Sequence, residues 1–129
     1  MKEIAKFLRK LRIDNNGENL GEMADKLDFS AAYLSAIENG KRAIPEDMQE
    51  RVFKNYVLTE EQKLEFSRIV AESREKVEIG LKDIQEKELF PEYVDTAVLF
   101  AHDLSQMNRA QLEEVRSLLL KIKTEEAPM

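Results

Sequence analysis

Lysine and arginine are the residues of this sequence whose clustering could do chemistry. The cationic side chains gather in two places, the first at Lys2, Lys6, Arg9, Lys10 and Arg12 and the second at Lys41 and Arg42. Clustered cations bind phosphate groups, so both places are candidate nucleic-acid contacts. A solvated helix face has the same pattern, and the clusters alone do not separate these two interpretations.

The net charge of −6 argues against a nucleic-acid partner when the chain is taken as a whole. The charge is unevenly distributed, however. Residues 1–58 contain ten basic and ten acidic residues, whereas residues 59–129 contain ten basic and sixteen acidic residues. Because the excess acid belongs to the second half, the first half remains compatible with binding phosphate.

The residue types used for catalysis and metal binding are scarce. There is no cysteine, which excludes disulfides, thiolate zinc sites and cysteine nucleophiles. His102 is the only histidine, and we expect its neighbour Asp103 to face a different direction on a helix. Acidic pairs such as Glu113-Glu114 are explained by helix surface charge. In the absence of a phosphate-binding glycine loop or a nucleophile motif, we predict no enzyme activity, no metal and no cofactor.

A length of 129 residues suits one domain, or one small domain with an appendage. The hydrophobic content of 43% is enough for a core, and a charged content of 36% with both signs is typical of soluble, helix-rich chains. No stretch approaches the ~20 apolar residues of a membrane span, and residues 1–14 lack the apolar core of a signal peptide. We therefore predict a cytoplasmic protein with no membrane partner.

Helices are the elements that must position the basic residues. Apolar residues with i, i+3, i+4, i+7 spacing predict a first helix that ends near Asp14. Asn19 with Glu22 forms a capping box for a second helix. Ser30 can cap a third, short helix, which Gly40 stops by adopting the left-handed conformation.

Two further helices and one extended segment follow. Pro45 suits the first turn of a fourth helix, and Thr59 with Gln62 forms a capping box for a fifth, which runs to about Lys76. Residues 77–81 alternate apolar and other side chains with the period of two that is typical of a strand. Because no second strand is readable, this segment is either an extended linker or pairs with the same segment of another subunit.

The last third of the chain predicts two helices. Pro91 opens one of them, and Asn108 with Gln111 forms a capping box for the other. The apolar residues of the last helix alternate three and four apart, at Leu112, Val115, Leu119 and Ile122. Two such helices form a hairpin that cannot bury both of its faces by itself. It must pack on the fifth helix or on another subunit.

One unit of the sequence, Leu20 to Asn39, has the pattern of two short helices joined by a tight turn. The second helix is expected to cross the first at close range, which requires a small residue at the crossing point, and this residue is Ala24. A hub of larger apolar residues holds the two helices at an angle of ~90–120°, namely Leu27, Phe29, Leu34 and Ile37. This geometry projects the second helix outward, where its N-terminal residues can enter a major groove.

The sequence here resembles the λ-repressor-like, Cro/C1-type (XRE family) helix-turn-helix in the run Ser30-Ala31-Ala32-Tyr33-Leu34-Ser35-Ala36-Ile37-Glu38-Asn39-Gly40-Lys41-Arg42, preceded by Met23-Ala24-Asp25-Lys26-Leu27. With the flanking helices, the resemblance covers roughly residues 2–75. It implies a five-helix DNA-binding domain, which we place at residues 1–76. Together with the residue patterns of the acidic region 77–129, the sequence predicts an all-α fold in which this domain is followed by a short extended segment and a helical hairpin. Family members usually act as dimers on palindromic operators.

The resemblance also implies roles for individual residues. Those that would face base edges are Ser30, Ala31, Ala32 and Ser35, with Ala36 beside them and Asn39 at the far end. Those that would lie near phosphates are Tyr33, Lys41 and Arg42. Because most of these side chains are small, we expect a modest readout per half-site, which makes dimerisation more important.

Two residues depart from the family's pattern. Asp28 stands where the turn usually has glycine, so it must adopt a positive φ, which Asp tolerates better than most residues. Leu20 stands where glutamine commonly opens the second helix, and this removes a polar group that the resemblance would place against the DNA backbone.

Three functions are compatible with these patterns. The leading one is a dimeric transcriptional repressor that binds an inverted repeat in double-stranded DNA through residues 1–76, while residues 77–129 dimerise or receive a regulatory signal. The main alternative is an antitoxin or related regulator, whose acidic C-terminal half binds a protein toxin or regulatory protein while the N-terminal half autoregulates the operon. The third is a protein-interaction module with a degenerate helix-turn-helix that does not bind DNA.

Overall fold

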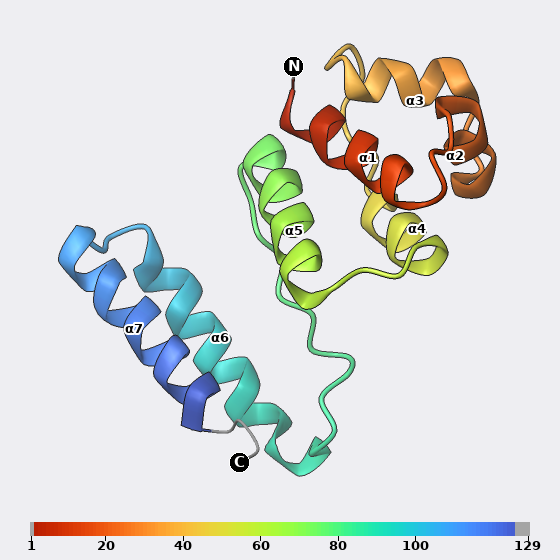
Figure 1. Ribbon diagram of the computed structural model, residues 1–129. Helices are drawn as coiled ribbons and strands as arrows, with labels where there is room; N and C mark the ends of the chain where they lie inside the picture. Colours follow the sequence, from red (N-terminus) through yellow and green to blue (C-terminus); the bar gives the residue numbers. More distant parts are fainter. Residues whose placement is uncertain (1, 126–129) are drawn as a thin grey trace. The chain divides into compact units, whose positions relative to one another are not determined.

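The computed structural model describes residues 2–125, and all of its regular elements are helices (Figure 1). They are α1 (Glu3–Asp14), α2 (Leu20–Leu27), α3 (Ala31–Glu38), α4 (Met48–Asn55), α5 (Glu60–Arg74), the 3-10 helix η1 (Lys87–Leu89), α6 (Phe90–Leu104) and α7 (Arg109–Glu125). The predicted all-α class is confirmed. None of these helices is long and apolar enough to cross a membrane. The chain divides between Val77 and Glu78 into two compact units, named here the N-terminal unit and the C-terminal unit.

Reciprocal capping boxes begin three helices where the sequence predicts them. In α2 the Asn19 side chain accepts the Glu22 N–H at 2.8 Å, and the Glu22 carboxylate accepts the Asn19 N–H at 3.0 Å. The same reciprocal pair opens α5 at Thr59 and α7 at Asn108. Each pair satisfies two backbone N–H groups that a helix start leaves without an intrahelical partner.

The core lies in the N-terminal unit. Among residues 2–124, every buried hydrophobic side chain lies between Ile4 and Val70. Phe66 of α5 is fully buried, and its ring centroid lies 5.0 Å from that of Phe7 in α1 and 6.0 Å from that of Phe53 in α4. These ring contacts hold three helices around one centre, because aromatic pairs at such distances attract each other beyond the area they bury.

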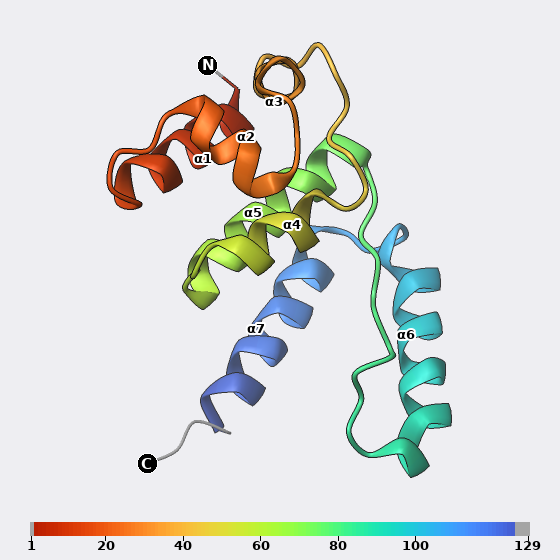
Figure 2. The same ribbon diagram turned by 90° about the vertical axis from the view of Figure 1, so that its right-hand side faces the viewer.

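The C-terminal unit is built differently. None of residues 78–124 is buried, and α6 and α7 splay apart from the turn that joins them (Figure 2). Large apolar side chains are therefore open to solvent, and Val98, Leu99, Leu118 and Leu119 are each between 57% and 63% exposed. The hairpin does not enclose a core of its own.

The start of α4 and the segment 77–81 are the two places where the local structure bears on a sequence-based expectation. α4 begins at Met48 rather than in the turn after Pro45, because the Pro45 carbonyl closes a tighter turn with the Met48 N–H at 3.1 Å and also accepts the Arg74 guanidinium at 2.7 Å. Residues 77–81 form no strand within the single chain, which agrees with an extended linker. Their pairing with the same segment of another subunit stays a prediction.

Candidate nucleic-acid interface

Helices α2 and α3 pack against each other across a connection of three residues, 28–30. Asp28 turns the chain with φ 59° and ψ 44°, so its predicted positive φ is confirmed. The next residue, Phe29, donates its N–H to the carbonyl of the buried Ala24 at 2.9 Å. Leu34 and Ile37 bury the inner side of α3. The opposite side of α3 therefore faces outward.

The outward side of α3 carries small and polar side chains. Ala32, Ser35, Ala36 and Asn39 follow i, i+3, i+4, i+7 spacing and share one face. Ala32 and Asn39 are exposed, while Ser35 and Ala36 are half-buried. The Asn39 amide donates to the Ser35 hydroxyl oxygen at 3.4 Å. This face offers two hydrogen-bonding side chains and two methyl groups, and a large ligand can approach it closely.

Three more of the predicted site residues lie at the start of α3. The Ser30 hydroxyl oxygen accepts the Tyr33 N–H at 3.1 Å and caps the helix, while remaining exposed. Ala31 is exposed beside it. The half-buried Tyr33 ring meets the Phe29 ring edge-on, with centroids 5.2 Å apart. Tyr33 therefore lies at the boundary between the core and the outward face.

Cations gather at the end of α3. Lys41 and Arg42 are exposed, and their backbone N–H groups donate to the Ala36 carbonyl at 2.9 and 3.2 Å. Gly40 permits this reversal by adopting a φ of 77°. Lys2 reaches the same place from the N-cap of α1, because a β-carbon added at Gly40 would lie 2.8 Å from Lys2 Cε. Residue spacing places Lys41 and Arg42 beside α3, but only the packing of α1 brings Lys2 there.

One member of the first basic cluster is not on the surface. Arg12 is 7% exposed and pairs with Glu38 of α3, with Nη1 at 2.9 Å from Oε2 and Nη2 at 3.2 Å from Oε1. Its Nη1 also contacts Met23 Sδ at 3.3 Å. Neither a solvated face nor a phosphate contact describes Arg12, because it neutralises a buried carboxylate 26 residues away. The pair ties α1 to α3, and the other four cations of the cluster are exposed.

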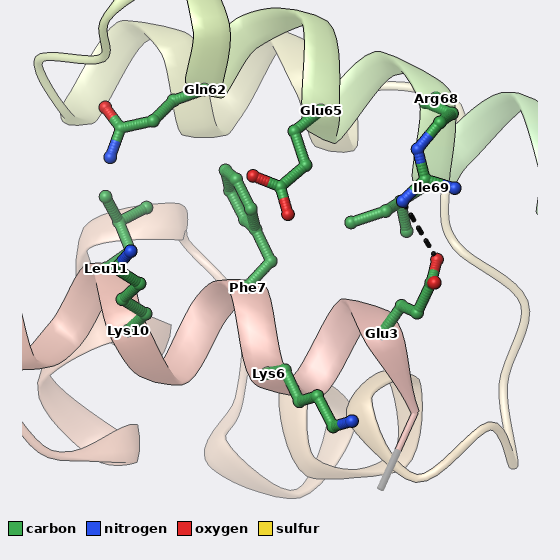
Figure 3. A pocket seen from close by; sticks show the side chains of 9 residues that line it. All are labelled: Glu3, Lys6, Phe7, Lys10, Leu11, Gln62, Glu65, Arg68 and Ile69. Carbon is green, nitrogen blue, oxygen red and sulfur yellow. Dashed lines mark hydrogen bonds and ion pairs between the residues drawn. The ribbon is translucent and has the colours of Figure 1, made fainter.

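A groove of ≈ 270 Å³ lies between α1 and α5 (Figure 3). It is lined by Glu3, Lys6, Phe7, Lys10, Leu11, Gln62, Glu65, Arg68 and Ile69. Arg68 donates to Glu72 at 2.7 Å and to Glu3 at 3.3 Å, and the bond to Glu72 contributes most to raising the pKa of the Arg68 guanidinium. Charged side chains of both signs line the groove, so it does not create a strongly positive or strongly negative potential. Its ion pair between Arg68 and Glu3 connects α1 to α5.

No three histidine or carboxylate side chains gather into a metal site within the part of the chain that the structure describes. His102 is exposed on α6, and its Nδ1 lies 2.9 Å from Asp103 Oδ1. The expectation that Asp103 faces a different direction is wrong, because neighbouring exposed side chains can bend toward each other. One such pair offers fewer ligands than the four that zinc takes in proteins.

No model of a known protein family matches this chain, and neither a curated protein nor a solved structure matches it. The geometry of α3 and its neighbours is therefore the basis for inferring function.

Proposed function

We propose that this protein is a sequence-specific, double-stranded DNA-binding transcriptional regulator that acts as a dimeric repressor in the cytoplasm. Residues 1–76 form its λ-repressor-like helix-turn-helix domain, and the recognition helix, residues 30–39, enters the major groove. One observation carries this proposal. α3 is buried on one side, has a shallow hydrogen-bonding face on the other, and ends beside three cations.

The outward face of α3 suits direct readout of base edges. Hydroxyl and amide groups match the donors and acceptors of the major groove, and they come from Ser30, Ser35 and Asn39. Methyl groups pack on the thymine methyl, and they come from Ala31, Ala32 and Ala36. Each contact is weak because each side chain is small. Two half-sites bound by two copies supply the specificity that one copy lacks.

The cations at the end of α3 suit phosphate binding. The backbone of Lys41 and Arg42 is held by bonds to the Ala36 carbonyl, so both side chains start from fixed positions beside the end of the helix. Lys2 adds a third charge beside Gly40, and the Tyr33 hydroxyl adds a hydrogen-bonding group. Such contacts set the register of the protein on DNA without reading sequence.

A second copy of the chain covers the apolar faces of α6 and α7. Two helices cannot enclose a core, whereas four helices from two copies can. Ten large apolar side chains of α6 and α7 are exposed. Eight of them at roughly 100 Å² each would bury about 800 Å² per copy, which is the size of a standard interface. The only formal charges of α6 are acidic, and α7 from Arg116 onward carries three basic residues against one acidic residue, Glu125, so one copy's α6 attracts this part of the other's α7.

The first experiment is selection of bound sequences from a random DNA library at two salt concentrations, with the oligomeric state measured by light scattering in the same buffer. We expect a dimer that enriches an inverted repeat with half-sites about one helical turn apart. No enrichment, or binding that vanishes uniformly at physiological salt, would overturn the proposal and leave α2 and α3 as a scaffold for protein contact.

Substitutions separate phosphate contacts from base contacts. Lys41→Ala with Arg42→Ala weakens binding to all sequences and, because each of the two copies loses two cations, lowers the slope of log K against log salt by about 4. Ser35→Ala mainly relaxes the choice of sequence. Arg9→Ala with Lys10→Ala removes the same charge from the first basic cluster on α1, and a smaller change in salt slope for this pair would assign phosphate binding to Lys41 and Arg42. An equal loss of affinity on all sequences for both the cation and the serine variants would contradict these roles.

The charge distribution favours one second function, that of an antitoxin. Residues 78–103 contain seven acidic and two basic residues, whereas residues 104–129 contain four of each. In this alternative the segment 78–103 binds a basic toxin, and the N-terminal unit represses the shared operon. Co-expression with the products of neighbouring genes distinguishes the two functions, because an antitoxin co-purifies tightly with a toxin whereas the repressor purifies as a homodimer alone.

A further inference from the structure

Arg51 of α4 lies against the turn between α2 and α3, at a point where the backbone needs support. The last carbonyls of a helix have no intrahelical donors, and the turn then passes through Asp28 at φ 59°. The Asp28 side chain is 99% exposed, so its own packing does not hold this conformation. A non-glycine residue persists in the left-handed region when its surroundings determine it.

The Arg51 guanidinium supplies that support. Its Nη1 donates to the Leu27 carbonyl at 2.7 Å and to the Asp28 carbonyl at 3.5 Å. The same nitrogen lies 4.0 Å from the Asp28 carboxylate. A cation is also favoured here because the C-terminal end of α2 carries the negative end of the helix dipole.

Arg51 is itself held in place from two sides. Its Nε donates to Asp47 Oδ2 at 2.8 Å, within the same turn of chain that opens α4. The centre of its guanidinium lies 4.7 Å from the centroid of the Phe29 ring, a cation–π distance. Phe29 in turn braces Tyr33 of α3. A continuous set of contacts therefore runs from α4 through the turn to α3.

We propose that Arg51 is a positioning residue for the recognition helix: it locks the turn at Asp28 and thereby sets the angle at which α3 is presented. This inference rests on the proposed function. Glycine would adopt the left-handed conformation at position 28 freely. Asp28 does not, and the bonds from Arg51 to the Leu27 and Asp28 carbonyls stabilise that conformation instead. Lysine cannot replace it, because only the planar guanidinium donates to the turn, bonds Asp47 and stacks on Phe29 at once.

The test compares Arg51→Met, Arg51→Lys and the control Lys54→Met, which removes one cation from the same helix. We expect both Arg51 variants to bind the selected operator about tenfold more weakly than the wild type. Affinity for unrelated DNA should fall equally in Arg51→Met and Lys54→Met, because each loses one charge. A merely structural defect would lower both affinities and the melting temperature together. Parallel loss of specific and unspecific binding would overturn the inference.

Amide hydrogen exchange tests the turn without DNA. The Phe29 N–H, bonded to Ala24, should exchange about tenfold faster in both Arg51 variants and at the wild-type rate in Lys54→Met. In an Asp28→Gly background the effect of Arg51→Met on operator binding and on Phe29 exchange should shrink. An unchanged Phe29 rate would refute the lock even if DNA binding falls. If the wild type itself prefers no DNA sequence, the proposed function fails, and Phe29 exchange still decides the role of Arg51 in the turn.

Discussion

The N-terminal and C-terminal units contain the same kinds of capped, amphipathic helices, but only the N-terminal unit packs them into a buried core. α2 and α7 both begin with an asparagine capping box, and both units contain amphipathic helices. The five helices of the N-terminal unit share one buried core, which includes the fully buried Phe66, whereas none of residues 78–124 is buried. An apolar stripe therefore becomes part of a core only when several helix faces meet around it, whereas a two-helix hairpin leaves its faces open.

The two units differ in how firmly their helices are held, and this difference suits them to different functions. The N-terminal unit holds α3 by the buried ion pair from α1 and by packing against α2, so the outward face has one geometry. The C-terminal unit offers exposed leucines and no enclosed core, which suits assembly with a second chain. Each region can be perturbed by substitutions that should leave the other intact.

The largest effect is expected from the buried ion pair of the N-terminal unit. Glu38→Ala leaves the Arg12 guanidinium buried without its partner and should lower the free energy of unfolding by about 3–5 kcal/mol. Denaturant unfolding followed by tyrosine fluorescence measures this. Arg12→Met combined with Glu38→Leu should lose less, because no charge is left unpaired. A loss under about 1 kcal/mol for Glu38→Ala would show that the pair does not hold α3.

The next effect concerns the C-terminal unit. Leu119→Asp should raise the dissociation constant of the dimer about 100-fold or more, because it puts a charge into the proposed interface. Sedimentation at several concentrations measures this. Leu120→Asp is the matched control, since Leu120 is similarly exposed but points about 100° away around the helix. A stably folded, unchanged dimer of Leu119→Asp would place the interface elsewhere.

The pH dependence of unfolding should separate the units further. Tyr56 of the N-terminal unit is buried and donates a hydrogen bond to Glu18, and burial followed by this bond raises the pKa of Tyr56 well above its ordinary value of 10.0. Above pH 10 the unfolded chain loses this proton while the folded chain keeps it, so stability falls as pH rises. Relative to Tyr56→Phe, the wild type should lose up to about 1.4 kcal/mol per pH unit. Equal slopes for the two proteins would contradict the raised pKa.

The smallest effect compares matching caps in the two units. Asn19→Ala should lower the unfolding free energy of the N-terminal unit by about 1 kcal/mol, because α2 is part of a cooperative core. Asn108→Ala removes the same cap from α7 and should shorten that helix without changing the unfolding of the N-terminal unit. Circular dichroism and thermal unfolding of both variants measure the two outcomes. Equal loss of N-terminal stability in both would mean that the units unfold together.

The parts of the fold that sequence predicts depend on interactions between near neighbours. Asn19 bonds Glu22 three residues on, and Ser30 caps Tyr33 three residues on. Such contacts repeat at fixed spacing, so residue type and spacing are enough to predict them. The start of α4 is an exception. Pro45 predicts a helix start in its own turn, but the Pro45 carbonyl accepts a bond from Arg74, which lies 29 residues further along the chain.

Residue types and spacing are enough to predict the helices, their caps and the apolar stripes, because each depends on residues within about one turn of one another. Tertiary packing decides which cations stay on the surface and which side chain supports the left-handed turn at Asp28. It turned Arg12 inward to Glu38, brought Lys2 to Gly40 and laid Arg51 on the turn after α2. These contacts join residues 24 to 38 positions apart, and spacing along the chain does not encode which helix faces will meet.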